Sequence, residues 1–430
     1  MRFMTLDPGH FHAALVQKSM YPQVSPIVDV YAPPGFDLDE HLKRIEGFNG
    51  RAESPTSWQT NVHTSARPYE EMIRDKPGSV VILAGRNSRK MSYILGSVEN
   101  GLHVLADKPW IIDEEDLPQL ERALSLAASH GVAAYDIMTE RFEVTNELQR
   151  ELVNEPAIFG SIVEGTLEDP AVHMRSVHHI VKEVAGKPLR RPTWFFDIRE
   201  QGEALADIGT HLVDHTLWTL SPRDLLDYRS DVEVSGARRW PTVMTREQFA
   251  RVTGADDFPS ELRPWVEENE LSFFANTSVD YTVRGVHVHL DVLWDLESRE
   301  HGDTHYAVYR GDRARIEIRQ TVEEDWQPEI YVIPNASDAK VAVFGAVRSR
   351  VAELQDRWPG LATEERGDEI RIIIPERHRS GHEAHFGEVT ERFLHYLQDP
   401  ASLPVWEKSS MMAKYFITTR GSALSLLGES

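Results

Sequence analysis

The sequence predicts an α/β protein with an N-terminal Rossmann domain, built on a doubly wound parallel sheet, and a C-terminal α+β domain. The second domain is expected to hold a large open sheet that is predominantly antiparallel or mixed. Three observations support this fold class: apolar runs alternate with helix-like stretches in residues 1–135, a glycine-containing turn follows the first run, and strand-like runs dominate the second half. We expect domains at 1–140 and 141–430, with C-terminal helices that pack back on the first.

The first domain is predicted to alternate strands with helices. The run SVVILA at 79–84 is almost continuously apolar, which is typical of a strand buried on both faces of a parallel sheet. The other predicted strands are 2–6, 27–32, 103–106 and 132–135, and the predicted helices are 39–45, 90–100, 114–130 and one from Ala13 onward.

The second half is predicted to be rich in strands with alternating faces. In 286–294 the apolar side chains share one face, while His287, His289 and Asp291 share the other. The predicted strands are 162–167, 271–283, 286–294, 304–310, 314–320, 329–332 and 369–374. The predicted helices are 143–152, 207–220, 346–358, 382–397 and one or two more in the tail.

Composition narrows the class of protein. The chain has 430 residues, 41% of them hydrophobic, which supports sizeable folded cores. Its formal net charge of −23 disfavours nucleic acid and membranes as partners, and the lack of cysteine excludes disulfides and thiolate sites. The first residues lack the apolar run of a signal peptide, and no later segment is apolar for the length of a membrane span, so we expect a soluble, cytoplasmic protein.

A strand–turn–helix unit at residues 2–16 stands where a dinucleotide-binding domain carries its G-x-G-x-x-G fingerprint. The turn, DPGHFH at 7–12, has one glycine at the three fingerprint positions, because Asp7 and His12 stand at the first and third. The spacing alone allows either a variant nucleotide site or a turn without a ligand.

Two segments carry side chains suited to acid–base chemistry. Lys108 follows an apolar strand and would face the crevice at the carboxyl ends of parallel strands, although a surface lysine in a turn is an equal alternative. Asp207 and His211 are four residues apart, so on a helix the carboxylate could orient the imidazole and raise its basicity. The alternative is that Asp207 caps the helix and His211 is structural.

Adjacent histidines at 178 and 179 form a third candidate. Neighbouring side chains point to different sides of a strand, so His178 and His179 are poor joint metal ligands, although one could bind a sugar hydroxyl. A metal site that adds Asp207 and His211 is conceivable, but the spacing does not require one. We therefore assign no residue to a metal.

These motifs together resemble the glucose–fructose oxidoreductase / inositol dehydrogenase (Gfo/Idh/MocA) family. The turn at 7–12 corresponds to its glycine-rich loop, and GLHVLADKP at 101–109 to its A-G-K-H-V-x-x-E-K-P segment. LADIGTHLVD at 205–214 corresponds to its L-x-D-x-G-x-H-x-x-D segment. The stretches 191–197, 302–306 and 381–386 resemble a branch with its own oxidoreductase C-terminal domain.

The resemblance implies a nicotinamide cofactor and oxidation of a secondary hydroxyl on a sugar, glycoside or polyol. His211 would take the hydroxyl proton, Asp207 would hold the imidazole, and Lys108 would stabilise the alkoxide. The residues that would bind the cofactor are Gly9, His10, Phe11, His12, Ala84, Arg86, Asn87, Asp107 and Lys108. The residues that would bind the substrate are His178, His179, Trp194 and Asp197.

Several alternatives stay open in the sequence. NAD is preferred over NADP, but both are possible, because Asp29 and Asp37 are both misplaced for the carboxylate that binds the adenosine ribose in this family. The other functions are redox-neutral cleavage or isomerisation of a glycoside with tightly bound NAD, a non-catalytic sugar or nucleotide sensor, and a metal-dependent isomerase or hydrolase that uses His178, His179 and His211. The mixed second sheet favours a homo-oligomer, either a dimer or a tetramer.

Overall fold

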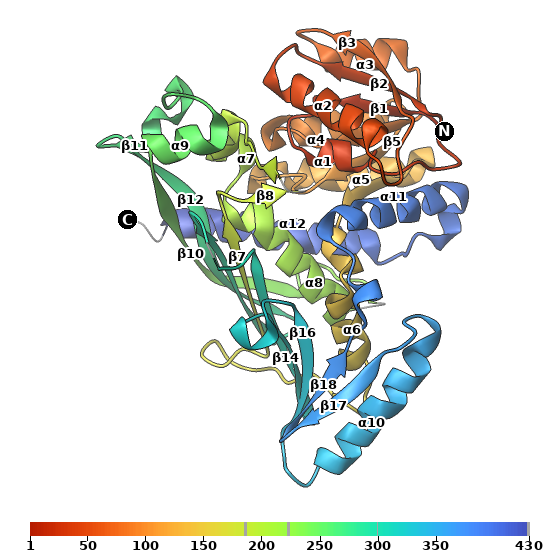
Figure 1. The fold of residues 1–430 in the computed structure, drawn as a ribbon, viewed down its shortest axis with the longest axis vertical. Coiled ribbons are helices and arrows are strands. Elements are labelled where there is room, and N and C mark those ends of the chain that lie inside the picture. Colours follow the sequence, from red (N-terminus) through yellow and green to blue (C-terminus); the bar gives the residue numbers. More distant parts are fainter. Residues whose placement is uncertain (185–186, 222–223, 299, 428–430) are drawn as a thin grey trace.

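The computed structural model describes residues 1–184, 187–221, 224–298 and 300–427. It confirms the predicted fold class: a parallel six-stranded sheet covered by helices is followed by a large mixed sheet (Figure 1). The chain ends in two helices that return to the N-terminal part, where the blue and red segments lie against each other in Figure 1.

The N-terminal sheet has the Rossmann strand order β3-β2-β1-β4-β5-β6, and all of its pairs are parallel. Its carboxyl edge therefore collects the chain segments that follow β1, β4 and β5. The strands are β1 (Phe3–Leu6), β2 (Ile27–Ala32), β3 (Gln59–Thr64), β4 (Val80–Leu83), β5 (His103–Asp107) and β6 (Ala134–Ile137).

Both faces of this sheet are buried, as the apolar run at 79–84 predicts. Val80 and Ile82 join one hydrophobic cluster, with α1, α2 and α11, whereas Val81 and Leu83 join a second, with α3, α4, α5 and α12. These helices are α1 (His12–Leu15), α2 (Phe36–Gly50), α3 (Pro68–Asp75), α4 (Lys90–Glu99), α5 (Leu117–His130), α11 (His382–Gln398) and α12 (Glu407–Leu427).

The sequence explains the limits of α5 directly. Pro118 lies in its first turn, where a missing N–H costs no helical hydrogen bond. Gly131 follows the last residue with a φ of 65°, the left-handed conformation that ends many helices and that glycine adopts without strain.

The C-terminal sheet has the order β10-β12-β13-β7-β14-β15-β16-β18-β17, and β11 pairs with β12. Only β13 and β7 run parallel in it, so the predicted mixed, mainly antiparallel sheet is confirmed. A separate pair joins β8 and β9. The strands are β7 (Val172–His179), β8 (Glu183–Val184), β9 (Lys187–Pro188), β10 (Val232–Thr245), β11 (Val266–Glu267), β12 (Glu270–Val283), β13 (Val286–Asp295), β14 (Thr304–Arg310), β15 (Ala314–Arg319), β16 (Glu329–Pro334), β17 (Ala362–Arg366) and β18 (Glu369–Ile373).

One face of this sheet packs against helices to form the second core. On β13 the apolar residues Val288, Leu290 and Val292 are buried in that core, while His287 and His289 lie on the opposite, partly open face, as the alternation predicts. The helices of this domain are α6 (Val144–Val153), α7 (Ile198–Gln201), α8 (Thr210–Leu220), α9 (Arg246–Thr253) and α10 (Lys340–Glu353).

A buried ionic cluster joins the two parts of the molecule. The ammonium of Lys414 on α12 lies 2.6 Å from Asp136 at β6 and 2.9 Å from Asp214 on α8. Arg141 donates two hydrogen bonds to Asp214 and a third, of 2.6 Å, to Glu407 at the start of α12. The C-terminal helix is therefore fixed to the Rossmann sheet and to α8 at one point.

Some sequence predictions are wrong in detail. Residues 162–167 form no strand, since Ile162 and Gly165 make only isolated bridges, and Gly165 has a φ of 69°. The helix expected at 207–220 begins at Thr210, after a π-helical turn over Leu205–Gly209. The helix expected at 346–358 is α10, followed by a 3₁₀ turn over Leu354–Asp356. The sequence analysis did not predict β3, α3, β7, β10, α9 or β17, and residues 428–430 of the tail lie outside the described residues.

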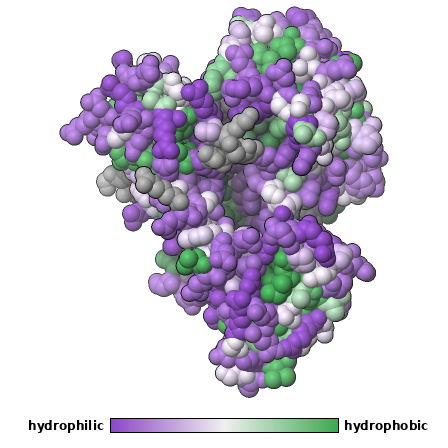
Figure 2. Space-filling model, viewed as in Figure 1, coloured by the Kyte–Doolittle hydropathy of each residue, from purple (hydrophilic) through white to green (hydrophobic). Residues whose placement is uncertain are grey.

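The surface matches the acidic, hydrophilic composition. Hydrophilic residues cover most of the face in Figure 2, and hydrophobic surface is confined to small patches. Among the helices that the structure describes, none combines the length and the apolar character needed to cross a bilayer.

Candidate active site

A cavity of about 850 Å³ lies between the carboxyl edge of the Rossmann sheet and the wall made by the large sheet and α8. Just over half of the 19 histidines in the chain line it, so its wall is rich in groups that can donate or accept protons. The expected crevice at the carboxyl ends of the parallel strands is thus present and open to a small molecule.

The turn after β1 keeps the backbone of a dinucleotide fingerprint. Asp7, at the first glycine position, has a φ of 48°, the left-handed conformation that glycine usually supplies. Gly9 stands at the second glycine position of the fingerprint, where it presents no side chain. Its N–H and that of His10, however, donate hydrogen bonds to the carbonyl oxygen of Ala84, at 3.1 and 2.9 Å. Two amides that could approach a pyrophosphate are therefore already bonded within the protein.

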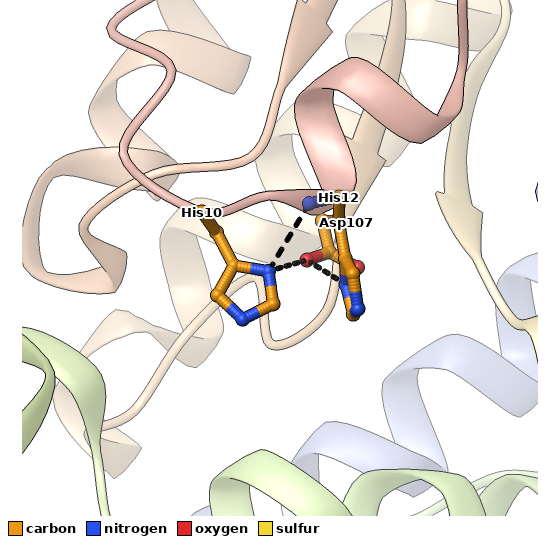
Figure 3. Close-up of side chains that lie close together, drawn as sticks. All are labelled: His10, His12 and Asp107. Carbon is orange, nitrogen blue, oxygen red and sulfur yellow. Dashed lines mark hydrogen bonds and ion pairs between the residues drawn. The ribbon is translucent and has the colours of Figure 1, made fainter. Parts of the chain in front are cut away.

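The side chains of His10 and His12 turn toward Asp107 at the end of β5 (Figure 3). Nδ1 of His12 lies 2.9 Å from a carboxylate oxygen of Asp107, and Nδ1 of His10 lies 3.7 Å from the same oxygen. Burial lowers the pKa of both imidazoles well below its usual value, so both are neutral near pH 7.

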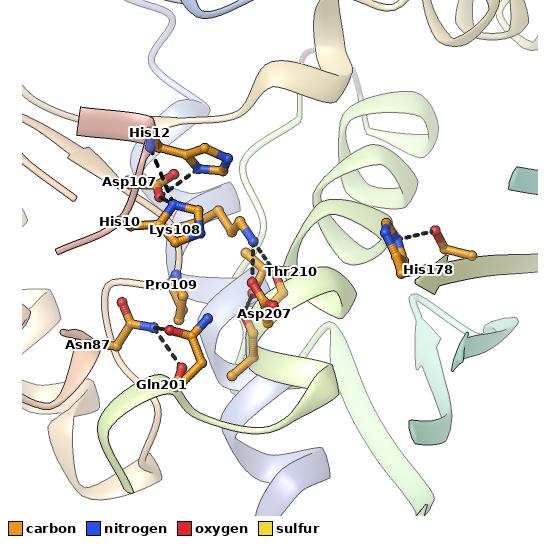
Figure 4. A network of polar contacts seen from close by, with 12 residues as sticks. His10, His12, Asn87, Asp107, Lys108, Pro109, His178, Gln201, Asp207 and Thr210 are labelled. Carbon is orange, nitrogen blue, oxygen red and sulfur yellow. Dashed lines mark hydrogen bonds and ion pairs between the residues drawn. The ribbon is translucent and has the colours of Figure 1, made fainter. Parts of the chain in front are cut away.

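Lys108 and Asp207 form the central contact of the cavity (Figure 4). The ammonium of Lys108 donates to the Asp207 carboxylate at 2.6 Å and to its backbone carbonyl at 2.8 Å, and the lysine side chain is 4% exposed. Burial alone raises the pKa of Asp207, but the adjacent ammonium outweighs it and holds that pKa well below its usual range. The Asp207 carboxylate is therefore ionised at neutral pH.

A second buried lysine supports the chain at this point. Lys90 at the start of α4 donates to the Asn87 side chain at 2.5 Å and to the carbonyl oxygens of Asp107 and Pro109 at 2.8 and 3.0 Å. Burial lowers the pKa of Lys90 to about 8. Because Lys90 binds the backbone on both sides of Lys108, it fixes the direction in which Lys108 leaves the strand.

His211 lies beside this pair but does not pair with Asp207 as expected. Asp207 sits in the π-helical turn before α8 and is engaged by Lys108, whereas Nδ1 of His211 is buried with no hydrogen-bond partner among the described residues. Burial, followed by the charge of Lys108, lowers the pKa of His211 to about 3. A neutral imidazole that lines the cavity, as His211 does, can exchange a proton with a bound hydroxyl group.

The large sheet forms the opposite wall through one row of side chains. Trp294 on β13 lies opposite His178 on β7, and Ser176 lies opposite His305 on β14. His178 accepts or donates at both ring nitrogens, 2.7 Å from the Ser176 hydroxyl and 3.0 Å from Asp303. Asp303 also binds Nδ1 of His179 at 3.3 Å and Lys182 at 2.5 Å.

Glutamates close the cavity on the side of α6 and α11. Burial, followed by the neighbouring charge of Glu140, raises the pKa of Glu143 to about 7. Its neighbour Glu140 lies 3.6 Å from His382 at the start of α11. A carboxyl group that titrates near neutrality inside a cavity is a candidate proton carrier.

The structure places the predicted site residues in two groups. The cavity is lined by His10, Phe11, His12, Lys108, His178, His179, Asp207 and His211. The predicted site residues of the second group contact other parts of the protein instead of the cavity. Asn87 donates to the backbone carbonyl of Gln201 at 2.6 Å, and the guanidinium carbon of Arg86 lies 5.3 Å from the ring centre of Trp194.

Trp194 and Asp197, expected to contact substrate, are not among the residues that line the cavity. The indole N–H of Trp194 donates to Asp37 at 3.0 Å, and its ring covers Gly9 so closely that a Cβ there would lie 2.8 Å from it. The Asp197 carboxylate accepts from the Arg199 backbone and side chain, and so caps α7. The substrate role for Asp197 is not supported, because this carboxylate is used within the fold.

Several residues of the cavity wall were not predicted from the sequence. The signal for some of them was present: Asp303, His305, His382 and His385 all lie in stretches that carried the family resemblance. Glu143 had no such signal, and neither had Lys90, which supports the backbone around Lys108 without lining the cavity, because the properties of both come from burial. The metal set His178, His179 and His211 lines the cavity, but among the described residues only two other groups bring three possible ligands within 4.8 Å.

Comparisons with known proteins identify the second domain. Residues 148–426 match the family model described as "Putative oxidoreductase C terminal domain". A crystal structure from Parabacteroides merdae ATCC 43184, described as "a putative oxidoreductase", is 44% identical, with a TM-score of 0.96 over 99% of this chain and 98% of that one. No protein among the curated sequences matches the chain.

More distant structures share the fold. GenD2 from gentamicin A biosynthesis, solved with NAD, is 13% identical, with a TM-score of 0.57 over 98% of this chain and 94% of that one. KijD10, a 3-ketoreductase from Actinomadura kijaniata solved with NADP and TDP-benzene, is 15% identical, with a TM-score of 0.55 over 96% and 94%. Family model, strand order and motifs agree, and the chain belongs to the Gfo/Idh/MocA oxidoreductases, in the branch that carries this C-terminal domain.

Proposed function

We propose that this protein is an NAD(P)-dependent oxidoreductase that interconverts a secondary hydroxyl group and a ketone on a carbohydrate-like small molecule. The observation that carries the proposal is the charged Lys108–Asp207 pair beside a neutral His211, in a cavity at the carboxyl edge of a 3-2-1-4-5-6 sheet. The many imidazole, carboxylate and amide groups of the cavity wall suit a substrate with several hydroxyls.

A nicotinamide dinucleotide fits the turn after β1, with one obstacle. The left-handed Asp7 and the bare Gly9 give the backbone shape of a fingerprint, and Phe11 lines the cavity beside them. The ring of Trp194 lies over Gly9, so a dinucleotide that reaches this glycine must displace the indole. When bound, the nicotinamide would supply the hydride acceptor or donor.

The residues of the cavity would control the proton and the charge. His211, which lines the cavity, would receive the hydroxyl proton on its imidazole during oxidation and return it during reduction. The Lys108 ammonium would donate a hydrogen bond to the reacting oxygen as negative charge develops there. Asp207 would hold that ammonium in place, which differs from the imidazole-holding role expected from the sequence.

Direct binding and turnover measurements test the proposal. Calorimetric titration of the full chain with NAD and NADP comes first, followed by a panel of sugars, glycosides and polyols monitored by nicotinamide absorbance. We expect His211→Asn to lower kcat/KM by roughly 100- to 10,000-fold while dinucleotide affinity stays within a few-fold. Lys108→Met should abolish turnover, and Lys43→Met, at an exposed lysine of α2, is its matched surface control.

The outcomes separate the candidate functions. Net reduction of NAD(P) by one class of polyol supports a dehydrogenase, whereas product formation without net cofactor change indicates the redox-neutral reaction. Failure to bind either dinucleotide, or near-normal turnover of His211→Asn on a good substrate, would refute the proposal.

A further inference from the structure

We propose that His10, His12 and Asp107 form a binding site for a divalent transition-metal ion of the zinc class, open toward the cavity. Two neutral imidazoles and a carboxylate are a ligand set that such ions favour. The set comes from two elements far apart in the sequence, the turn after β1 and the end of β5 (Figure 3).

The distances fit a metal ion without rebuilding the fold. With metal–ligand bonds of about 2.0–2.2 Å, the ligand atoms of a tetrahedral site lie roughly 3.3–3.5 Å apart. The two imidazole Nδ1 atoms lie 2.9 and 3.7 Å from the Asp107 oxygen, on either side of that value. All three ligand atoms lie within 4.8 Å of one another, so shifts of up to about one ångström would bring them to the spacing of a coordination site.

The hydrogen bonds of the cluster leave a place for a cation. Nδ1 of His10 accepts a hydrogen bond of 3.5 Å from the backbone N–H of His12 and so carries no proton, and it lies 3.7 Å from an Asp107 carboxylate oxygen, so two acceptors lie close together. No lysine or arginine in the described part of the chain ion-pairs with this carboxylate, because Lys108 is bound to Asp207. A cation between the acceptors would satisfy both.

A similar cluster elsewhere shows what a metal-free arrangement looks like. His173, His289 and Asp291 also bring three possible ligands together, on the other face of the large sheet. There Arg175 lies 3.3 Å from Asp291, and His289 bridges Asp291 and Asp280 with hydrogen bonds that raise its pKa to about 9. Protonated groups already balance that carboxylate, which is not so at Asp107.

A bound ion would act on the substrate rather than close the site. His10 and His12 line the cavity, so coordination positions not filled by the three side chains face the space where a substrate would lie. The ligands expected there are oxygen atoms, either water or a hydroxyl or carbonyl oxygen of the substrate. The proposal does not depend on dinucleotide binding, since the metal ligands are side chains and the backbone of the turn at Gly9 takes no part in the site.

Metal binding can be measured without any activity. The full chain, with purification tag removed and metal stripped by a chelator, is titrated with Zn²⁺ by calorimetry and with Co²⁺ by its visible absorption. We expect one tight site per chain with the spectrum of a low-coordinate cobalt centre. His10→Ala and Asp107→Asn should each weaken binding by about 100-fold or more, beyond the 10- to 100-fold typical for loss of a supporting group.

The second cluster provides matched controls. His173→Ala and Asp291→Asn remove the same ligand types from the outer face and should leave the stoichiometry and affinity unchanged. Absence of a stoichiometric site, or binding that survives both His10→Ala and Asp107→Asn, would overturn the proposal. Loss of binding in the outer-face variants alone would also overturn it, because it would place the metal at His173. Circular dichroism of the metal-free variants is the measurement that checks whether each remains folded.

Discussion

Replacing Lys108 with methionine tests the contact on which the site is built. The variant removes a buried ammonium that makes two hydrogen bonds to Asp207, at 2.6 and 2.8 Å, and leaves a carboxylate whose side chain is only 13% exposed without a cation. Breaking one partner out of a buried ion pair costs about 3–5 kcal/mol. We therefore expect Lys108→Met to lower the free energy of unfolding by that amount, in addition to abolishing turnover.

A double-mutant cycle isolates the interaction. The neutral pair Lys108→Met/Asp207→Asn removes the uncompensated charge, so it should recover most of the lost stability while remaining inactive. Urea unfolding of the four proteins, monitored by circular dichroism, gives the coupling energy. A Lys108→Met variant within about 0.5 kcal/mol of the parent, the range of an ordinary surface change, would refute the ion pair.

The same contact predicts a pH dependence. Lys108 holds the pKa of Asp207 below its ordinary value of 3.8, so the stabilisation by this pair is complete above that pH and is lost as the pH falls below it. In Lys108→Met the ammonium is gone, so burial raises the pKa of Asp207. The cost of burying its unpaired carboxylate is then largest at high pH, where the group is ionised. The stability gap between variant and parent should therefore narrow on acidification.

Three further outcomes are expected. Trp194→Ala should strengthen dinucleotide binding several-fold in calorimetry, because the indole covers Gly9; weaker binding would show that the ring supports the cofactor. Burial raises the pKa of Glu143 from 4.5 to about 7, so between these pH values the folded state holds a proton that the unfolded state has lost. The free energy of unfolding should therefore fall by up to about 3 kcal/mol as the pH rises from 4.5 to 7, and Glu143→Gln should remove this fall. Lys414→Met should destabilise the chain by about 3–5 kcal/mol in urea unfolding, since it leaves the buried Asp136 without its cation, and a loss under 1 kcal/mol would contradict the ionic cluster.

The sequence predicted the framework of the site because its signals are local. The strand before Lys108 and the turn at Gly9 can both be predicted from the residues next to them in the sequence. Both lie at the carboxyl ends of parallel strands, where a Rossmann domain binds its ligands. The fold class, the family and the alternating faces of the strand at 286–294 were likewise readable from periodicity and motifs.

The remaining features depend on contacts between distant segments. Asp207 was expected to hold His211, but a π-helical turn and the ammonium of Lys108 redirect its carboxylate, and neither is visible in a spacing of four residues. Trp194 was expected at the substrate, yet a hydrogen bond to Asp37, more than 150 residues away, draws it over Gly9. The raised pKa of Glu143 is a product of burial, which the sequence does not show.

The position of Lys414 has a consequence for the order in which the molecule can be completed. This residue joins β6 to the helix that carries His211, although it follows His211 by about 200 residues. During synthesis the Rossmann strands and the π-helical turn emerge long before α12, so the Lys108–Asp207 and Arg141–Asp214 pairs can form first, whereas the tie that Lys414 makes between β6 and α8 forms only when the last helix docks. Catalytic competence should thus arise as a late event in biosynthesis, after the full chain has left the ribosome, and a nascent chain would carry the chemistry-bearing residues without their final alignment.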